Sequence, residues 1–564
     1  MSEQPSPEPR PDRRTREVAM YGDEMVEERQ EASYDWVNEK IQNPELRTEI
    51  IRIVKKYHGG RAGKWHSSLC GSYNAVFVIE FQDPESYGMM RVPLPRFSLE
   101  LREEKVQAEV NLMRYVAANT TIPIPHIYHS GTASQNPTGL GPFIIMDYHP
   151  NLVHLSTFLA DPDTDPEAPN TINPTMPEDK ILSLYRQMSN ILLQLDKLTM
   201  PQSGCLGYVD GEYTVHARAL PQTLTDTITM AGCPESVLGP SNRVLNTSHE
   251  VYQFLTDLHI AQLVFQRNDA VESADDARDK YTARHMLRRA AYMNLLPSPS
   301  YTSRQEHITP TPETFKLICD DLTPHNVLVD PETGEVRAVI DWEWAWFGPR
   351  SMAADPPWWL MLRKPDMWNG GVEGGLDDWV GKYPKYLGIF LRALEQEEEK
   401  LGKGQEVTVP CLGEPLEDDK VAEDGTVSER LDNLHISGDS SSSSTTTTTT
   451  TTISTNQEGP KEPPLSVRMR KNWEDGSFWI NYAARRSYGL DPIYWKFIDE
   501  RLFGENPAGG YEKRAESMTA EARELMEMVV TDKMKEKNGE RKVVEWFAEE
   551  ARGHLARVLG YGQL

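Results

Sequence analysis

The chain has 564 residues, of which 59 are Lys or Arg and 86 are Asp or Glu, so its formal net charge at pH 7 is −27. This length is enough for a large core or for more than one domain, since domains typically run to about 100–200 residues. The acidic balance argues against a nucleic-acid partner, because the sequence shows no segregated basic face that could overcome the repulsion.

The first 18 residues are charged and Pro-rich, with no apolar stretch that could serve as a secretory signal or a membrane span. We therefore expect no membrane partner, and a location in the cytosol or nucleus with cytoplasmic as the default. The five cysteines are scattered and none lies in a CxxC pair, which favours neither a disulfide framework nor a zinc site. The sequence does not indicate an oligomeric state.

Taken in chain order, residues 1–33 are predicted to be a disordered arm and residues 34–148 a small β-rich lobe that binds a nucleotide. Within this lobe the apolar runs at 75–81 and 143–146 are short and strand-like, and a helical stretch at about 99–118 separates them. A larger helical lobe is expected at 149–402, because residues 181–198 and 251–266 show helical periodicity.

One compact β segment at 315–340 is set into the helical lobe, with strands predicted at 315–319, 326–329 and 336–340. The connection Asp330-Pro-Glu-Thr-Gly334 between the last two strands is a good hairpin signal. Residues 403–465 contain runs of five Ser and eight Thr and are predicted to be a disordered acidic insertion. The aromatic-rich start of residues 466–564 predicts a helical extension that packs on the helical lobe.

The main chemical signal lies at the mouth of the β segment. Asp321 precedes Asn326 by five residues, and Asp341 directly follows the last predicted strand. A carboxylate that accepts a hydroxyl proton, together with an amide and a carboxylate on Mg²⁺, are the groups that phosphoryl transfer requires. The residue types alone leave an ordinary alternative open at even odds, in which the three are turn residues and a strand terminator.

The whole string Ile318-Cys-Asp-Asp-Leu-Thr-Pro-His-Asn-Val-Leu-Val-Asp330, followed by Val339-Ile-Asp-Trp-Glu343, resembles the aminoglycoside phosphotransferase and choline kinase family. The resemblance covers roughly residues 60–360 and implies an α+β, two-lobed protein-kinase-like fold. It also implies that Asp321 is the catalytic base, that Asn326 and Asp341 are the Mg²⁺ ligands and that ATP is the phosphate donor. The chain departs from the pattern at Cys319, where the family usually has His.

The same resemblance implies a nucleotide site in the N-terminal lobe. The loop after Cys70 would offer the backbone N–H groups of Gly71 and Ser72 to phosphate oxygens. Arg91 stands where the family has a phosphate-binding Lys, and Glu109 in the following helix would pair with it. Adenine would meet backbone groups between Met146 and Tyr148. Read singly, these positions are more often a Gly-Ser turn, solvated charges and a buried strand.

The acceptor is expected to be a small molecule with a hydroxyl group. The run Trp342-Glu-Trp-Ala-Trp346 suggests a cationic amino alcohol or aminoglycoside-like acceptor, because aromatic faces beside a carboxylate can hold a cation. The alternative for these tryptophans is packing within the lobe. A second reading of the whole chain is an inactive pseudokinase that binds nucleotides or acts as a scaffold. A protein kinase is disfavoured, because no Asp-Phe-Gly to Ala-Pro-Glu segment follows the catalytic loop.

Overall fold

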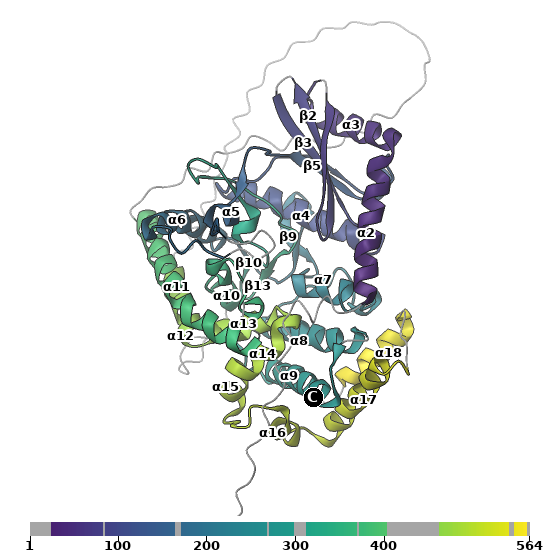
Figure 1. Cartoon of the computed structure of the whole chain (residues 1–564), viewed down its shortest axis with the longest axis vertical. Helices are drawn as coiled ribbons and strands as arrows, with labels where there is room; N and C mark the ends of the chain where they lie inside the picture. Colours follow the sequence, from purple (N-terminus) through teal and green to yellow (C-terminus); the bar gives the residue numbers. More distant parts are fainter. Residues whose placement is uncertain are drawn as a thin grey trace, which may run out of the picture. The chain divides into compact units, whose positions relative to one another are not determined.

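The structure is a computed structural model that describes residues 24–61, 63–82, 85–163, 171–267, 270–297, 312–368, 372–402, 462–540 and 546–560. These residues form one compact unit, which joins the chain on either side of the insertion (Figure 1). Most of the predicted disordered insertion, residues 403–461, lies outside the described residues. None of the described helices has the length and hydropathy that crossing a membrane requires.

The N-terminal lobe is an antiparallel sheet covered by helices. Within the described residues the strand order is β1-β2-β3-β5-β4. The elements are α2 (Glu24–Gln42), α3 (Pro44–His58), β1 (Lys64–Cys70), β2 (Asn74–Gln82), β3 (Glu85–Pro93), α4 (Leu99–Asn119), β4 (Ile127–Gly131) and β5 (Phe143–Asp147). Helix α3 begins at the N-cap Asn43, whose side chain accepts from two backbone N–H groups.

Alternation along the strands separates two cores in this lobe. In β5, Phe143 and Ile145 pack in a cluster with α3, whereas Ile144 and Met146 join the main core that includes α4. In β3, Met90 and Val92 face the α3 side. Because successive side chains point to opposite faces of a strand, Arg91 between them faces α4 and the other lobe.

The prediction of a disordered arm to residue 33 is wrong for residues 24–33, which form the first half of α2. The sequence of this half is dominated by charged residues, and only scattered side chains such as Val26 and Ser33 are buried. The weak apolar pattern explains why the helix is not visible in the sequence. Residues 1–23 lie outside the described residues.

The C-terminal lobe is mainly helical, as expected. Helix α6 packs along α11, α8 packs on α9, and α17 covers α9 (Figure 1). The helices before the insertion are α5 (Leu155–Leu159), α6 (Glu178–Leu195), α7 (Gln222–Thr229), α8 (Ser248–Phe265), α9 (Ala274–Tyr292), α10 (Arg350–Ala353) and α11 (Val372–Gly402). Among the strands, β8 (Cys205–Val209) and β9 (Glu212–Ala217) form a hairpin.

The predicted β segment divides between two small sheets. The hairpin of β11 (Val327–Val329) and β12 (Val336–Val339) forms as expected, and β6 (Val153–His154) joins it. Strand β10 (Phe315–Cys319) instead pairs with β13 (Ala345–Gly348) and β7 (Thr199–Met200). The segment is therefore not one sheet, because β10 finds its partners outside it.

The segment after the insertion packs back on the C-terminal lobe, as its aromatic content predicts. Helix α12 contacts α11, and α13 contacts α8 and α10. The elements are α12 (Leu465–Glu474), α13 (Ser477–Ala484), α14 (Leu490–Ile493), the π-helix η8 (Tyr494–Ile498), α15 (Asp499–Phe503), α16 (Tyr511–Glu516), α17 (Ala520–Lys537) and α18 (Ala548–Leu559). Helix α12 begins at Leu465, one residue inside the predicted insertion.

Candidate active site

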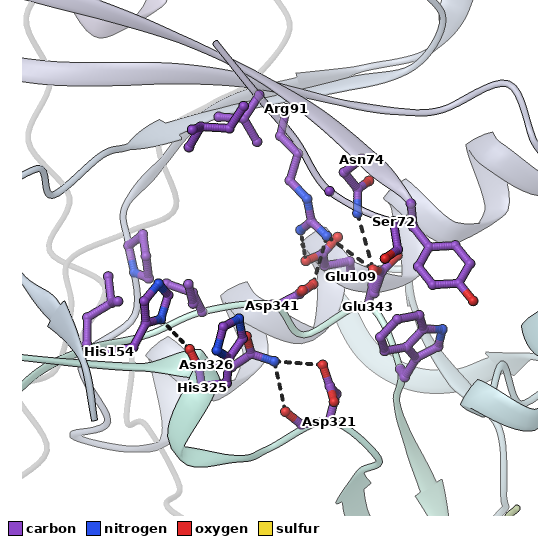
Figure 2. Close-up of a pocket in the computed structure, with 18 of the residues that line it drawn as sticks. Ser72, Asn74, Arg91, Glu109, His154, Asp321, His325, Asn326, Asp341 and Glu343 are labelled. Carbon is purple, nitrogen blue, oxygen red and sulfur yellow. Dashed lines mark hydrogen bonds and ion pairs between the residues drawn. The ribbon is translucent and has the colours of Figure 1, made fainter. Parts of the chain in front are cut away.

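A cavity of about 720 Å³ lies between the sheet of the N-terminal lobe and the β11–β12 hairpin. Its volume falls in the range of sites that bind small molecules and cofactors. All the residues that the sequence predicts for the site line it: Gly71, Ser72, Arg91, Glu109, Met146, Tyr148, Asp321, Asn326 and Asp341. Figure 2 shows the side chains of Ser72, Arg91, Glu109, Asp321, Asn326 and Asp341, contributed by both lobes, around this space.

The loop after β10 places Asp321 beside Asn326. The side-chain amide of Asn326 donates to the backbone carbonyl of Asp321 at 2.9 Å and to its carboxylate at 2.7 Å (Figure 2). The short 3₁₀ turn η4 (Pro324–Asn326) makes this return possible, and Thr323 caps it. Burial raises the pKa of Asp321, although Lys364 and Arg486 act in the opposite direction. The carboxylate is thus oriented by an amide and faces the cavity.

Asp341 follows the hairpin in a left-handed backbone conformation, with φ at 61°. This region is uncommon for residues other than glycine, and Asp is among the side chains that tolerate it best. The turn is fixed on both sides, since the backbone N–H of Ile340 donates to the carbonyl of Asn326 and the indole of Trp342 donates to the carbonyl of Val339. The turn directs the Asp341 carboxylate toward Arg91 (Figure 2).

Arg91 pairs with both lobes. Its guanidinium binds Glu109 of α4, as the sequence predicts, and also the Asp341 carboxylate at 2.8 Å. Burial lowers the pKa of Arg91, but the carboxylates of Glu109, Asp341 and Glu343 raise it by more, so the net shift is upward. The guanidinium therefore stays charged in the cavity and is available to an anionic ligand as well as to its own carboxylates.

Asp341 lies among other carboxylates of the site. Burial raises the pKa of Asp341 to about 7, and the carboxylates of Glu343, Glu109 and Asp321 contribute in the same direction against Arg91. Burial also raises the pKa of Glu109. Such a shift marks a carboxylate that would gain from an additional positive charge nearby.

Glu343 and Lys105 form a buried ion pair beneath the cavity. Their charged atoms lie 2.9 Å apart, both side chains are 3% exposed, and the amide of Asn74 donates to the same carboxylate at 3.2 Å. Burial raises the pKa of Glu343, but Lys105 and Arg91 outweigh it and the net shift is downward. The sequence analysis did not identify Lys105. Its spacing was a usable signal, because Lys105 precedes Glu109 by four residues on α4 and so lies on the same helix face.

The tryptophans of the run from Trp342 to Trp346, which were expected to hold a cationic acceptor, are either buried in the core or covered by a lysine. Trp342 and Trp346 are 1% and 0% exposed in the core. Trp344 does line the cavity, but the ammonium of Lys105 lies over its ring at 5.5 Å and over the ring of Tyr73 at 5.2 Å. The structure therefore corrects this prediction, because the cation held by these aromatic faces is a lysine of the same protein.

Two predicted backbone donors are also engaged within the protein. The N–H of Gly71 donates to the carbonyl of Asn74 at 2.9 Å and closes the turn between β1 and β2, so it is not available to a phosphate in this conformation. After β5, the N–H groups of Asp147 and Tyr148 donate to the carbonyls of His126 and Tyr87. The expectation that the N–H of Gly71 is available to a phosphate is therefore not met in this conformation, although the residue does line the cavity.

Several other cavity residues gave no usable signal in the sequence. The ring of His154 stacks on that of His325 with 4.6 Å between centroids, and its Nδ1 meets the backbone carbonyl of His325 (Figure 2). The lining also includes Gln222, Asp226, Met230, Lys364 and Met367. They come from segments that only the tertiary fold brings together.

No family model and no curated protein sequence matches the chain. The chain is similar to solved structures, which include an aminoglycoside phosphotransferase described as putative from Ralstonia eutropha, with 13% identity, 62% of this chain and 80% of that chain covered, and a TM-score of 0.33. A Plasmodium vivax ethanolamine kinase shows 10% identity, 68% and 82% coverage and a TM-score of 0.33. A microcompartment-associated aminopropanol kinase shows 9% identity, 91% and 98% coverage and a TM-score of 0.34. Likenesses of this size carry no argument about the activity of this chain.

Proposed function

We propose that this protein is an ATP-dependent phosphotransferase that transfers the γ-phosphoryl group to the hydroxyl of a small molecule. The observation that carries the proposal is the convergence of Asp321, Asn326 and Asp341 in one interlobe cavity, opposite the guanidinium of Arg91. A proton acceptor, oxygen ligands for a divalent cation and a fixed cation for phosphate are the parts that phosphoryl transfer uses.

In this proposal Asp321 accepts the proton of the acceptor hydroxyl. The acceptor oxygen forms a bond to the γ-phosphorus, the bond from that phosphorus to the bridging oxygen of ADP breaks, and the hydroxyl proton moves to the Asp321 carboxylate. The two bonds from the Asn326 amide to Asp321 fix the carboxylate for this transfer. A general base must lie within hydrogen-bond reach of the hydroxyl, and orientation by a neighbouring amide meets that need.

Mg²⁺ is proposed as the cofactor, with Asn326 and Asp341 as its protein ligands. The donor set fits, because the groups are amide and carboxylate oxygens, and a cation beside Asp341 would offset the burial that raises the pKa of this carboxyl. Among the described residues, no group of three or more His, Cys, Asp or Glu could hold a metal alone. Mg²⁺ commonly takes one or two carboxylates and completes its coordination with substrate phosphates and water, where it neutralises the phosphate charge.

The triphosphate is proposed to lie between Arg91 and the loop of Gly71 and Ser72, with adenine toward Met146 and Tyr148. Arg91 supplies the charge-assisted contact to phosphate, and Glu109 holds it in place. Since the N–H groups of Gly71, Asp147 and Tyr148 are engaged, we expect the loop to contribute through Ser72 and the base to meet other backbone and side-chain groups.

The acceptor is proposed to be a small hydroxyl compound. Recognition of a cationic amino alcohol or aminoglycoside would fall to Asp226 and Asp321, because the tryptophan run is closed and Glu343 is paired with Lys105. Lys364 also lines the cavity, and its charge opposes the rise that burial causes in the pKa of Asp321. A panel of neutral, cationic and anionic alcohols, tested for stimulated ADP release, would decide between these substrate classes.

The alternative is a pseudokinase that binds nucleotide without transferring phosphate. The observation that favours it is the direct ion pair between Arg91 and Asp341, which places a protein cation on the proposed metal ligand. Cys319 in place of the usual His of the resembled family points the same way. In this alternative the cavity would bind ATP while no acceptor stimulated turnover.

Calorimetric titration of ATP, with and without Mg²⁺, tests both readings in the wild type and in Asp341→Asn. We expect Mg²⁺-dependent binding that weakens at least about tenfold in the variant, since a carboxylate ligand is lost. Asp378→Asn is a matched control, because that carboxylate is exposed and pairs with Lys382 away from the cavity. Stimulated ADP release by any hydroxyl compound would establish transfer, whereas folded protein that binds no ATP would refute both readings.

A further inference from the structure

Asp320, the neighbour of the proposed base Asp321, is a buried junction of several elements. Its side chain is 0% exposed. One carboxylate oxygen accepts from the backbone N–H of Gln222, at the start of α7, at 3.1 Å and from the indole of Trp346 in β13 at 3.3 Å. The other oxygen accepts from Arg485 at 3.3 Å. The loop that carries Asp321 is thus fixed through the residue before it.

Arg486 contacts the backbone of Asp320. One terminal nitrogen of its guanidinium donates to the carbonyl oxygen of Asp320 at 2.9 Å, and the other donates to the side-chain carbonyl of Gln222. The Arg486 side chain is buried, with the residue 4% exposed. Because the carbonyl of Asp320 belongs to the peptide unit that leads into Asp321, this bond fixes the direction in which the Asp321 side chain leaves the backbone.

Arg485 is itself held by a second buried carboxylate. Its other terminal nitrogen pairs with Asp355 at 2.8 Å. Asp355 also accepts from Asn481 at 2.8 Å and from Asn472 at 3.0 Å, and both amides donate to the backbone carbonyl of Ser351. These partners lock the guanidinium in one orientation, so the contact with Asp320 does not depend on a flexible surface side chain.

Both arginines come from the segment that follows the insertion. They lie directly after α13, and 165 positions separate Asp320 from Arg485. The described residues that line the cavity do not include Arg485 or Arg486. They contact the site through hydrogen bonds to the loop, so the segment that supplies them is part of the active-site framework.

We propose that Arg485 and Arg486 are positioning residues, which hold the Asp320–Asp321 loop in the geometry that phosphoryl transfer needs. The inference rests on the proposed function and adds to it the requirement for the segment after the insertion. When a catalytic loop loses the hydrogen bonds that hold it to a rigid element, the rate of the reaction should fall steeply. A displacement of the catalytic group by about 1 Å can cost about 10²-fold in rate.

Steady-state kinetics of Arg486→Gln test this role. We expect kcat to fall by about 10- to 100-fold while KM for ATP stays within about threefold, because the arginine supports the loop and does not contact the nucleotide. Arg486→Lys should recover part of kcat, since an ammonium can still donate to the Asp320 carbonyl but cannot also span to Gln222. Arg470→Gln, in the same segment with an exposed ion pair to Glu395, is the matched control and should leave kcat unchanged.

Amide hydrogen exchange tests the positioning without any turnover, so it separates a failure of this inference from a failure of the proposed function. In Arg486→Gln the amides of Asp320, Leu322 and Asn326, which are bonded within or next to the loop, should exchange at least about tenfold faster. Amides of the β2–β3 pairing serve as an internal reference and should not change.

Unchanged protection of the loop in folded Arg486→Gln would overturn the inference, and so would a kcat equal to that of the wild type. Loss of protection in Arg486→Gln, together with a wild type that transfers no phosphate, would support the positioning role and refute the phosphotransferase. If the glutamine variant does not fold, Arg486→Lys and Arg485→Gln carry the same two measurements.

Discussion

The guanidinium of Arg91 joins the carboxylate of Asp341 at 2.8 Å, although 250 positions separate the two residues in the chain. Arg91 lies in the third strand of the N-terminal lobe and Asp341 follows the hairpin of the C-terminal lobe. The same guanidinium binds Glu109. One side chain therefore connects the two walls of the cavity and places a cation where we expect the phosphates.

Replacing Arg91 should affect both stability and nucleotide binding. In Arg91→Met the buried Glu109 loses its partner, and breaking a buried pair typically costs about 3–5 kcal/mol. Arg91→Lys should lose less free energy of unfolding than Arg91→Met. It should still bind ATP at least about tenfold more weakly than the wild type, because an ammonium cannot form two planar contacts. Urea denaturation and calorimetry measure the two effects, and equal ATP affinity in Arg91→Lys and the wild type would contradict the expected role of the planar guanidinium.

Asp321→Asn should separate binding from turnover. An amide oxygen can accept the bond that Asn326 donates to the carboxylate, and the bond to the backbone carbonyl is unaffected, so the loop should keep its conformation. We expect kcat to fall by about 10²- to 10⁴-fold, the usual contribution of a general base, while the affinity for ATP with Mg²⁺ stays within about threefold. Asp330→Asn, in the exposed hairpin turn, is the control. A variant that retained full turnover would exclude Asp321 as the base.

The pair of Lys105 and Glu343 should behave as a coupled unit in a double-mutant cycle. Lys105→Met leaves a buried carboxylate with weaker partners and should cost about 3–5 kcal/mol in the free energy of unfolding. Glu343→Gln alone leaves the ammonium buried in the same way. The double variant should lose clearly less than the sum of the two single losses, which chemical denaturation can measure. Strictly additive losses would show that the two charges do not stabilise each other.

Acid should destabilise the fold through His259. This side chain is 0% exposed and its Nδ1 contacts the hydroxyl of Ser487 at 2.7 Å. Burial, aided by Arg284, lowers the pKa of His259 to about 3 from 6.5. The unfolded chain therefore takes up a proton as the pH falls below about 6.5 while the folded protein does not. The contribution of this histidine to stability is complete above pH 6.5 and decreases as the pH falls toward 3.

The measurement is the free energy of unfolding between pH 7 and pH 5. One such group contributes a slope that rises through this window toward about 1.4 kcal/mol per pH unit near pH 5, where the unfolded histidine is almost fully protonated. His259→Asn should reduce the slope by that amount, whatever its effect on stability at pH 7. His216→Asn is the control, because His216 is exposed and its replacement should leave the slope unchanged. An identical slope in His259→Asn and the wild type would count against the buried neutral histidine.

The parts of the fold that the sequence predicts are those with local signals. The β11–β12 hairpin follows from two β-branched runs around a Pro-Glu-Thr-Gly turn. Strand β13 was not predicted, because Ala345-Trp-Phe-Gly348 is buried on both faces and shows no alternation. The pairing of β10 with β13 and β7 then depends on contacts between distant segments, which no local pattern specifies.

In the site, too, the residues with local sequence signals could be predicted, whereas those that depend on contacts between distant segments could not. The positions of Asp321, Asn326 and Asp341 follow from the hairpin, and Arg91 reaches them by strand alternation. The engaged N–H of Gly71 depends on the geometry of its turn, which residue types alone do not fix. The support by Arg485 and Arg486 was not predicted either, since nothing near them in the sequence indicates that they meet a loop 165 positions earlier.

The 165 positions between Asp320 and Arg485 also set an order of events during synthesis of the chain. A ribosome adds about 5–20 residues per second, so roughly 8–33 s pass between the synthesis of Asp320 and that of Arg485. For most of this interval, once Asp341 has been added, the nascent chain contains Arg91, Asp321, Asn326 and Asp341 but not the arginines that hold the loop. If the proposed function holds, a growing chain carries the groups proposed to bind the nucleotide well before the late helices have emerged and docked, so the proposed phosphate transfer has to wait for them.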